Sequence, residues 1–226
     1  MKKVLGVVLL VIGFIGTSLP VTAQGQGINF SARFGGMLPT NGEFTSARSL
    51  SDEFDLGLMY GAQVGLNLTP SLTLVGGFDF ASLPMAVDTN GNQPKLSIPH
   101  FFVKGHYNFT SLIKNPLNRI RPYLSFGGGL YSWKVTADGG SGNQVFGNGT
   151  QLKKTSFGLN FGPGFELSLS NSVALFAEGT YHFVFAKDNS FSGSVTPGNF
   201  SVVSGFDNLG FFAINGGLTF SLPMMK

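Results

Sequence analysis

The chain has 226 residues, a length that suits a single all-β domain. Asp, Glu, Lys and Arg make up only 11% of it, against about 25% in an average soluble domain, so a water-facing globule would expose wide apolar patches. The absence of cysteine excludes disulfides and thiolate metal sites. The formal net charge of +3 falls to +1 without Lys2 and Lys3, which excludes a basic surface for nucleic acid.

The first segment has the pattern of a secretory signal. A basic start at Lys2 and Lys3 is followed by an apolar run over residues 4–16, which is too short to span a bilayer. Small residues then occupy the two positions that a signal peptidase reads in Val21-Thr22-Ala23. We therefore predict a cleaved signal peptide over residues 1–23 and one domain over residues 24–226.

The rest of the chain alternates between apolar and polar or small residues with a period of two. Such a period puts the apolar residues on one face of a strand, whereas a helix would scatter them around its circumference. Eight segments show it: 28–34, 56–68, 72–80, 101–109, 123–135, 157–169, 173–185 and 212–220. The fifth is less regular, and its parity is expected to switch near Gly127–Gly129, as at a bulge or bend.

The connections between these segments differ in length. Residues 69–71 and 170–172 are tight turns and 110–119 is somewhat longer, whereas 39–55, 84–94, 137–154 and 186–208 are long and rich in Gly, Ser, Asn, Asp and Thr. Short turns at one end and long polar loops at the other are typical of outer-membrane barrels. We predict an eight-stranded antiparallel up-and-down transmembrane β-barrel with four exposed loops.

A soluble lipocalin-like barrel is the structural alternative, because it also has eight alternating strands. It needs large apolar residues inside and charged residues outside. Here the parity opposite the apolar one is small and polar, which suits the narrow lumen of an eight-stranded barrel. The apolar parity carries almost no charge, as expected for a face in lipid.

The chain resembles the small outer-membrane barrels of the OmpA, OmpX and opacity-protein type. The resemblance is carried by Arg121–Tyr123 leading into Gly127–Gly129, by the closing Gly217–Phe220, and by the signal peptide. It implies a place in the outer membrane, contact with lipopolysaccharide, and insertion by the barrel-assembly machinery. That machinery reads a terminal aromatic residue, which here is Phe220, displaced from the end by residues 221–226.

Ionisable residues on the inward parity are expected to form a structural network in the lumen, because charges in so dry a space must be paired. These residues are Arg33, Asp79, His100, Lys104, His106, Glu166, Glu178 and His182. The alternative is that paired carboxylates act in acid–base chemistry or in a gated ionic plug.

We predict that the protein is not an enzyme and binds no cofactor, and that its loops meet a host or extracellular ligand. The alternatives are a narrow channel for ions or small solutes and, by resemblance to outer-membrane acyltransferases and deacylases, a lipid-modifying enzyme that uses His100 or His182 near the outer rim. The acidic first loop has no calcium-loop spacing and is expected to be solvated. Its acidic residues are Glu43, Asp52, Glu53 and Asp55.

Overall fold

The computed structural model describes residues 27–45, 48–86, 94–109, 119–136, 146–147, 150–151, 153–187, 193–196, 201–202 and 207–223. The predicted signal peptide and its cleavage site lie outside these ranges. No helix among the described residues is long and apolar enough to cross a membrane.

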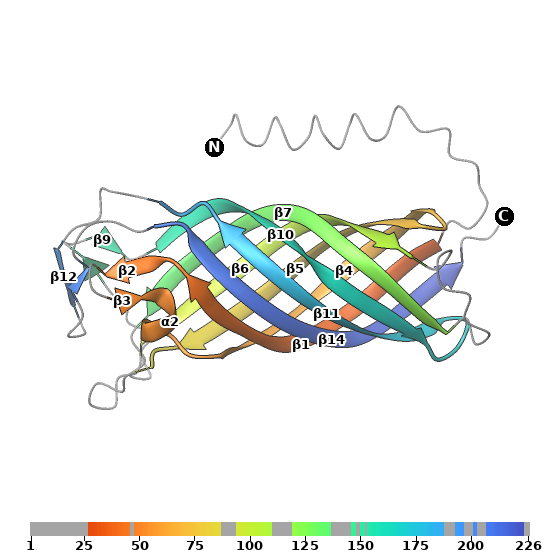
Figure 1. Ribbon diagram of the computed structural model, residues 1–226, viewed down its shortest axis with the longest axis horizontal. Coiled ribbons are helices and arrows are strands. Elements are labelled where there is room, and N and C mark those ends of the chain that lie inside the picture. The colour runs from red at the N-terminus through yellow and green to blue at the C-terminus, as the bar shows by residue number, and fades with distance from the viewer. Residues whose placement is uncertain are drawn as a thin grey trace.

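Eight long strands form a closed antiparallel barrel (Figure 1). Each pairs with its neighbour in the chain, and the last pairs with the first, with Gly27 opposite Pro223. The strands are β1 (Gly27–Asn41), β4 (Gly57–Thr69), β5 (Leu72–Pro84), β6 (Lys95–Asn108), β7 (Ile120–Thr136), β10 (Lys153–Ser168), β11 (Val173–Val184) and β14 (Leu209–Pro223). The predicted eight-stranded barrel is confirmed.

The strand ends joined by the long connections lie at one end of the barrel, here called the loop end, and those joined by the short turns lie at the other, the turn end (Figure 1). The first connection holds β2 (Glu43–Thr45), β3 (Arg48–Ser49) and a short helix, α2 (Leu50–Glu53). The third and fourth connections share a small sheet of order β13-β12-β8-β9. Its strands are β8 (Phe146–Gly147), β9 (Thr150–Gln151), β12 (Gly193–Thr196) and β13 (Ser201–Val202).

The two faces of the barrel wall differ as the alternation predicts. On β4, Val64 points outward and is 47% exposed, whereas the neighbouring Gln63 points into the lumen and is 8% exposed. Large apolar residues are exposed on every barrel strand; they include Phe34, Leu58, Leu72, Phe101, Phe126, Phe161, Leu175 and Ile214. The outer wall is therefore an apolar surface.

The expected parity switch in β7 is wrong. The pairing of β7 with β10 runs without a register shift from Lys134 to Ile120, through Gly127–Gly129. Gly129 faces inward, and a β-carbon there would collide with the Phe101 carbonyl and lie 2.7 Å from Nε2 of His100. The glycines mark a tightly packed wall, so the inward parity continues into Tyr131 and Trp133, both buried.

Those aromatic residues belong to an apolar core inside the loop end of the lumen, here called the loop-end plug. The expectation that the inward parity is small and polar throughout is thus wrong at this end. The plug consists of Met37, Leu50, Phe54, Met59, Ala81, Leu83, Met85, Leu96, Ile98, Tyr131, Trp133, Val135, Val184, Ala186, Leu209, Phe211 and Ala213.

Two of the plug residues come from the first connection, which the sequence predicts to be an exposed loop. Leu50 and Phe54 are instead fully buried in the mouth of the barrel. Backbone bonds hold the segment there: the Asp55 N–H donates to the Pro84 carbonyl at 2.9 Å, and the Ala86 N–H donates to the Glu53 carbonyl at 2.8 Å. Leu50 of α2 and Phe54, which follows the helix, thereby close the barrel from inside.

Candidate functional site

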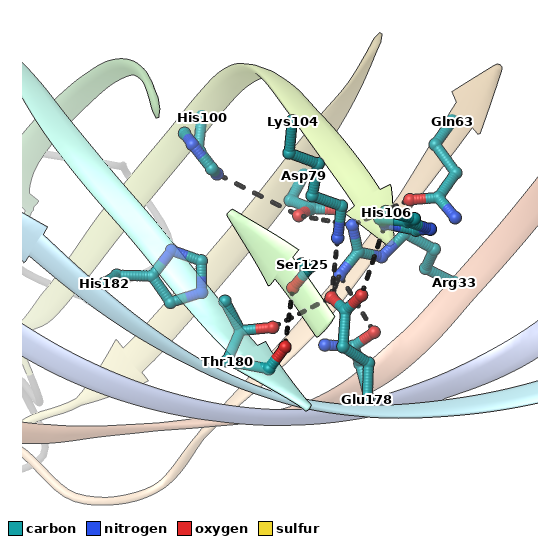
Figure 2. A network of polar contacts seen from close by, with 12 residues as sticks. Arg33, Gln63, Asp79, His100, Lys104, His106, Ser125, Glu178, Thr180 and His182 are labelled. Carbon is teal, nitrogen blue, oxygen red and sulfur yellow. Dashed lines mark hydrogen bonds and ion pairs between the residues drawn. The ribbon is translucent and has the colours of Figure 1, made fainter. Parts of the chain in front are cut away.

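Below the plug, the middle of the lumen holds a cluster of charged side chains, here called the ionic cluster, consisting of Arg33, Asp79, Lys104 and Glu178 (Figure 2). Lys104 Nζ donates to Glu178 Oε1 at 2.6 Å, and Arg33 Nη2 donates to the same oxygen at 3.3 Å. Arg33 Nη1 lies 3.4 Å from Asp79 Oδ2. The cluster joins β1, β5, β6 and β11 across the lumen.

The cluster is balanced in charge and almost sealed from water. Two cations face two carboxylates, and the side chains of Arg33, Asp79, Lys104 and Glu178 are at most 2% exposed. A buried charge is tolerated only when it is paired and hydrogen-bonded. Arg33, Lys104 and Glu178 meet both conditions, whereas Asp79 is paired with Arg33 but neither of its carboxylate oxygens has a hydrogen-bond partner. The ion pairs link four strands, so the cluster is suited to holding them together.

Neutral side chains complete the cluster. Tyr123 OH donates to Glu178 Oε2 at 3.2 Å, and Thr180 Oγ1 donates to Glu178 Oε1 at 2.8 Å. Arg33 donates to Gln63 Oε1 at 3.0 Å and to Asn215 Oδ1 at 2.9 Å. These four residues carry no charge, so they are not among the ionisable residues that the sequence predicts for the lumen. Their inward parity was the available signal.

The three histidines occupy two levels of the lumen. His106 stacks on Tyr123 with ring centroids 4.5 Å apart, and its Nε2 lies 3.6 Å from Glu178 Oε2. His100 stacks on Tyr131, and His182 Nδ1 shares a hydrogen bond of 2.8 Å with the Tyr131 hydroxyl. His100 and His182 therefore lie buried between the ionic cluster and the plug. The enzyme alternative requires them at the outer rim, above this position.

Glu166 lies apart from the other predicted lumen residues. Gly164, not Glu166, stands opposite Glu178, so Glu166 is one pleat closer to the turn end. There it forms an ion pair with Arg121, and both side chains are partly exposed. The structure thus brings seven of the eight predicted residues into the middle of the lumen and leaves Glu166 near its opening.

A polar pocket of about 290 Å³ occupies the turn end of the lumen. The Arg121–Glu166 pair and the rings of His106 and Tyr123 line it. Its remaining walls are mostly amide and hydroxyl side chains, including Asn29, Ser31, Gln63, Asn67, Thr73 and Thr219. A pocket with this lining has the size and the partners to hold water. Along the lumen, then, a polar pocket, an ionic cluster and an apolar plug follow one another.

The acidic residues of the first connection do not converge. Asp52 accepts a hydrogen bond from the Ser49 N–H at 3.2 Å in the capping box of α2, and Glu53 is buried at the barrel mouth. Among the described residues, no group of three or more His, Asp or Glu side chains could hold a metal ion.

No family model matches the chain, and no curated protein matches it. Among solved structures, Neisserial surface protein A superposes with a TM-score of 0.52 at 16% identity, covering 86% of this chain and 97% of that one. The chain has the fold of the small outer-membrane β-barrels. The outer membrane protein OprG from Pseudomonas aeruginosa gives a TM-score of 0.48 at 12% identity, covering 88% and 97%.

Proposed function

We propose that the protein is a barrel of the bacterial outer membrane that displays its loop-end connections to the exterior and acts as a structural or surface-interaction protein. The observation that carries the proposal is a closed wall that is apolar outside, around a lumen that is filled at the loop end. An apolar band on a closed barrel is suited to lipid, because every backbone group is paired within the wall. The predicted signal peptide supports export.

Substitutions on the two faces of β4 test whether the wall meets lipid. Val64→Arg places a charge on the outward face and is expected to cost about 2 to 4 kcal/mol near the bilayer midplane. Gln63→Glu is expected to be milder, because Arg33 already donates to Gln63 and would face a carboxylate there. The measurement is refolding into lipid vesicles followed by urea titration. Equal losses at both positions, or stable folding in plain buffer, would contradict a lipid-facing wall.

The filled lumen argues against the channel alternative. Tyr131 and Trp133 lie fully buried in the plug, and Leu50 and Phe54 close the mouth above them. We expect the protein to give no steady conductance in planar bilayers. Insertion is verified in parallel by protease protection in vesicles made from the same preparation. A steady ohmic current from verified insertions would overturn the structural role in favour of a channel.

The positions of the histidines argue against the enzyme alternative. A hydrolase or acyltransferase of the expected kind needs a histidine bonded to a serine near the outer rim. His182 is hydrogen-bonded to the Tyr131 hydroxyl instead. Ser125, a serine inside the lumen, donates its hydroxyl to the Gly162 carbonyl and not to a histidine. Lipid A from cells with and without the gene is expected to have the same composition.

The location itself is tested by fractionating membranes and by running the protein on gels with and without heating. A small outer-membrane barrel is expected in the outer-membrane fraction, with migration that shifts when heat unfolds it. Protease added to intact cells is expected to cut in the loop-end connections and to spare the barrel. Cleavage only after the outer membrane is permeabilised would reverse the proposed orientation.

A further inference from the structure

Two lysines stand side by side on the outer wall near the loop end. Lys134 of β7 is directly opposite Lys153 of β10, and both side chains are exposed on the outward parity. Within the described residues, neither ammonium group is paired with a carboxylate. Like charges directly opposite one another on a sheet destabilise it. The pair is therefore a site at which an anion would relieve repulsion.

The neighbouring residues fix the height of this pair on the wall. Toward the loop end, the outward residues of β7 and β10 change in the same order from apolar to hydroxyl to ammonium. The facing pairs are Leu130 with Phe157, then Ser132 with Thr155, then Lys134 with Lys153. The hydroxyls of the middle pair are 3.1 Å apart and hydrogen-bonded. The last apolar pair thus lies four residues below the lysines, with one hydroxyl pair between them.

A third lysine lies close to the pair. On β6, Ser97 stands opposite Lys134, and Lys95 is the next outward residue toward the loop end. Lys187 lies just beyond the end of β11, two residues after Phe185, whose N–H donates to the Phe157 carbonyl of β10 at 2.9 Å. Basic residues therefore stand on three neighbouring strands, β6, β7 and β10, and just beyond the end of a fourth, β11.

We infer that Lys134 and Lys153 bind a phosphate group of an anionic lipid headgroup in the outer leaflet, which in the outer membrane is the phosphorylated glycolipid lipopolysaccharide. The inference rests on the proposed function, because it needs the loop end to face outward. Both lysine side chains share the outward parity of Leu130 and Phe157, so they project from the wall toward the surrounding lipid, at the level of its headgroups. Long lysine side chains can place their charge in the headgroup region while their stems contact the wall.

The test is a titration of the folded protein in detergent micelles with lipid A that carries its phosphates, with the same lipid A after dephosphorylation, and with inorganic phosphate. Each lysine near an anionic lipid surface contributes about a fivefold change in affinity. The double variant Lys134→Gln/Lys153→Gln is expected to lose that factor for each lysine toward phosphorylated lipid A and to match the wild type toward the dephosphorylated form.

Two variants serve as controls. Lys134→Arg/Lys153→Arg keeps both charges and is expected to retain the binding. Arg119→Gln removes an exposed cation at the turn end and is expected to change nothing. Unchanged affinity of the double glutamine variant, or equally tight lysine-dependent binding of inorganic phosphate, would overturn the inference. Heat-modifiable migration of each variant checks folding, and fractionation of the wild type tests the outer-membrane location independently.

Discussion

Glu178→Gln is expected to lower the free energy of unfolding by about 3 to 5 kcal/mol, because removing one partner of a buried ion pair leaves uncompensated charge. Arg33 and Lys104 would then face Asp79 alone, in a part of the lumen almost sealed from water. The glutamine keeps the size of the side chain, so the loss reports charge and not a cavity. Urea titration of the protein refolded in lipid vesicles measures it.

Glu166→Gln is the matched control, since Glu166 is also a glutamate paired with an arginine. Its pair with Arg121 is partly exposed at the turn end, with side-chain exposures of 44% for Arg121 and 22% for Glu166. Exposed pairs contribute about 0 to 1 kcal/mol. Losses of the same size at Glu178 and Glu166 would mean that the ionic cluster does not hold the strands together.

Trp133→Ala is expected to cost about 3 to 5 kcal/mol, the usual range for removing a large aromatic side chain from a packed core. Trp133 is 1% exposed and lies in the loop-end plug. The variant removes the only tryptophan. Its unfolding in urea is therefore followed by the heat-modifiable shift on gels or by circular dichroism, and not by tryptophan fluorescence.

Phe126→Ala is the control on the same strand. Phe126 is 64% exposed on the outward parity of β7. Deleting its side chain loses the transfer of an apolar group from water to lipid, about 1.5 to 3 kcal/mol, but lipid tails fill the space and no cavity remains. We therefore expect a smaller loss than at Trp133. A larger loss at Phe126 than at Trp133 would mean that the assignment of inside and outside on β7 is reversed.

The period-two alternation predicted the barrel, the number of its strands and the outward face, because lipid and lumen select opposite residue types at successive positions. It failed on β7, where Tyr131 and Trp133 are apolar and nevertheless face inward. When every apolar residue is assigned to the outward face, apolar residues that face inward look like a change of parity along the strand. Leu50 and Phe54 belong to no period-two segment, because Leu50 lies in a short helix and Phe54 in an isolated bridge beside it. The alternation therefore could not assign them to the plug.

The residues of the ionic cluster were predictable from parity and charge, but their partners were not. Arg33 on β1 meets Glu178 on β11 although β14 lies between the two strands. That contact crosses the curved lumen and depends on the tilt and stagger of the closed sheet. One pleat of displacement along β10 is enough to separate Glu166 from Glu178. Such offsets depend on the geometry of the closed barrel, so they cannot be predicted from the sequence of a single strand.

The pairing of β1 with β14 imposes an order on assembly. Gly27 and Pro223 meet although almost the whole described chain lies between them, and Ser31 reaches the Thr219 hydroxyl at 2.9 Å across the same seam. Contacts so distant in sequence make folding slow, because the loop must be closed before they form. Until β14 docks, β1 and β11 are open edges able to pair with other chains. Among the described barrel strands, β1 is synthesised first, and its edge therefore stays open until β14, the last, arrives.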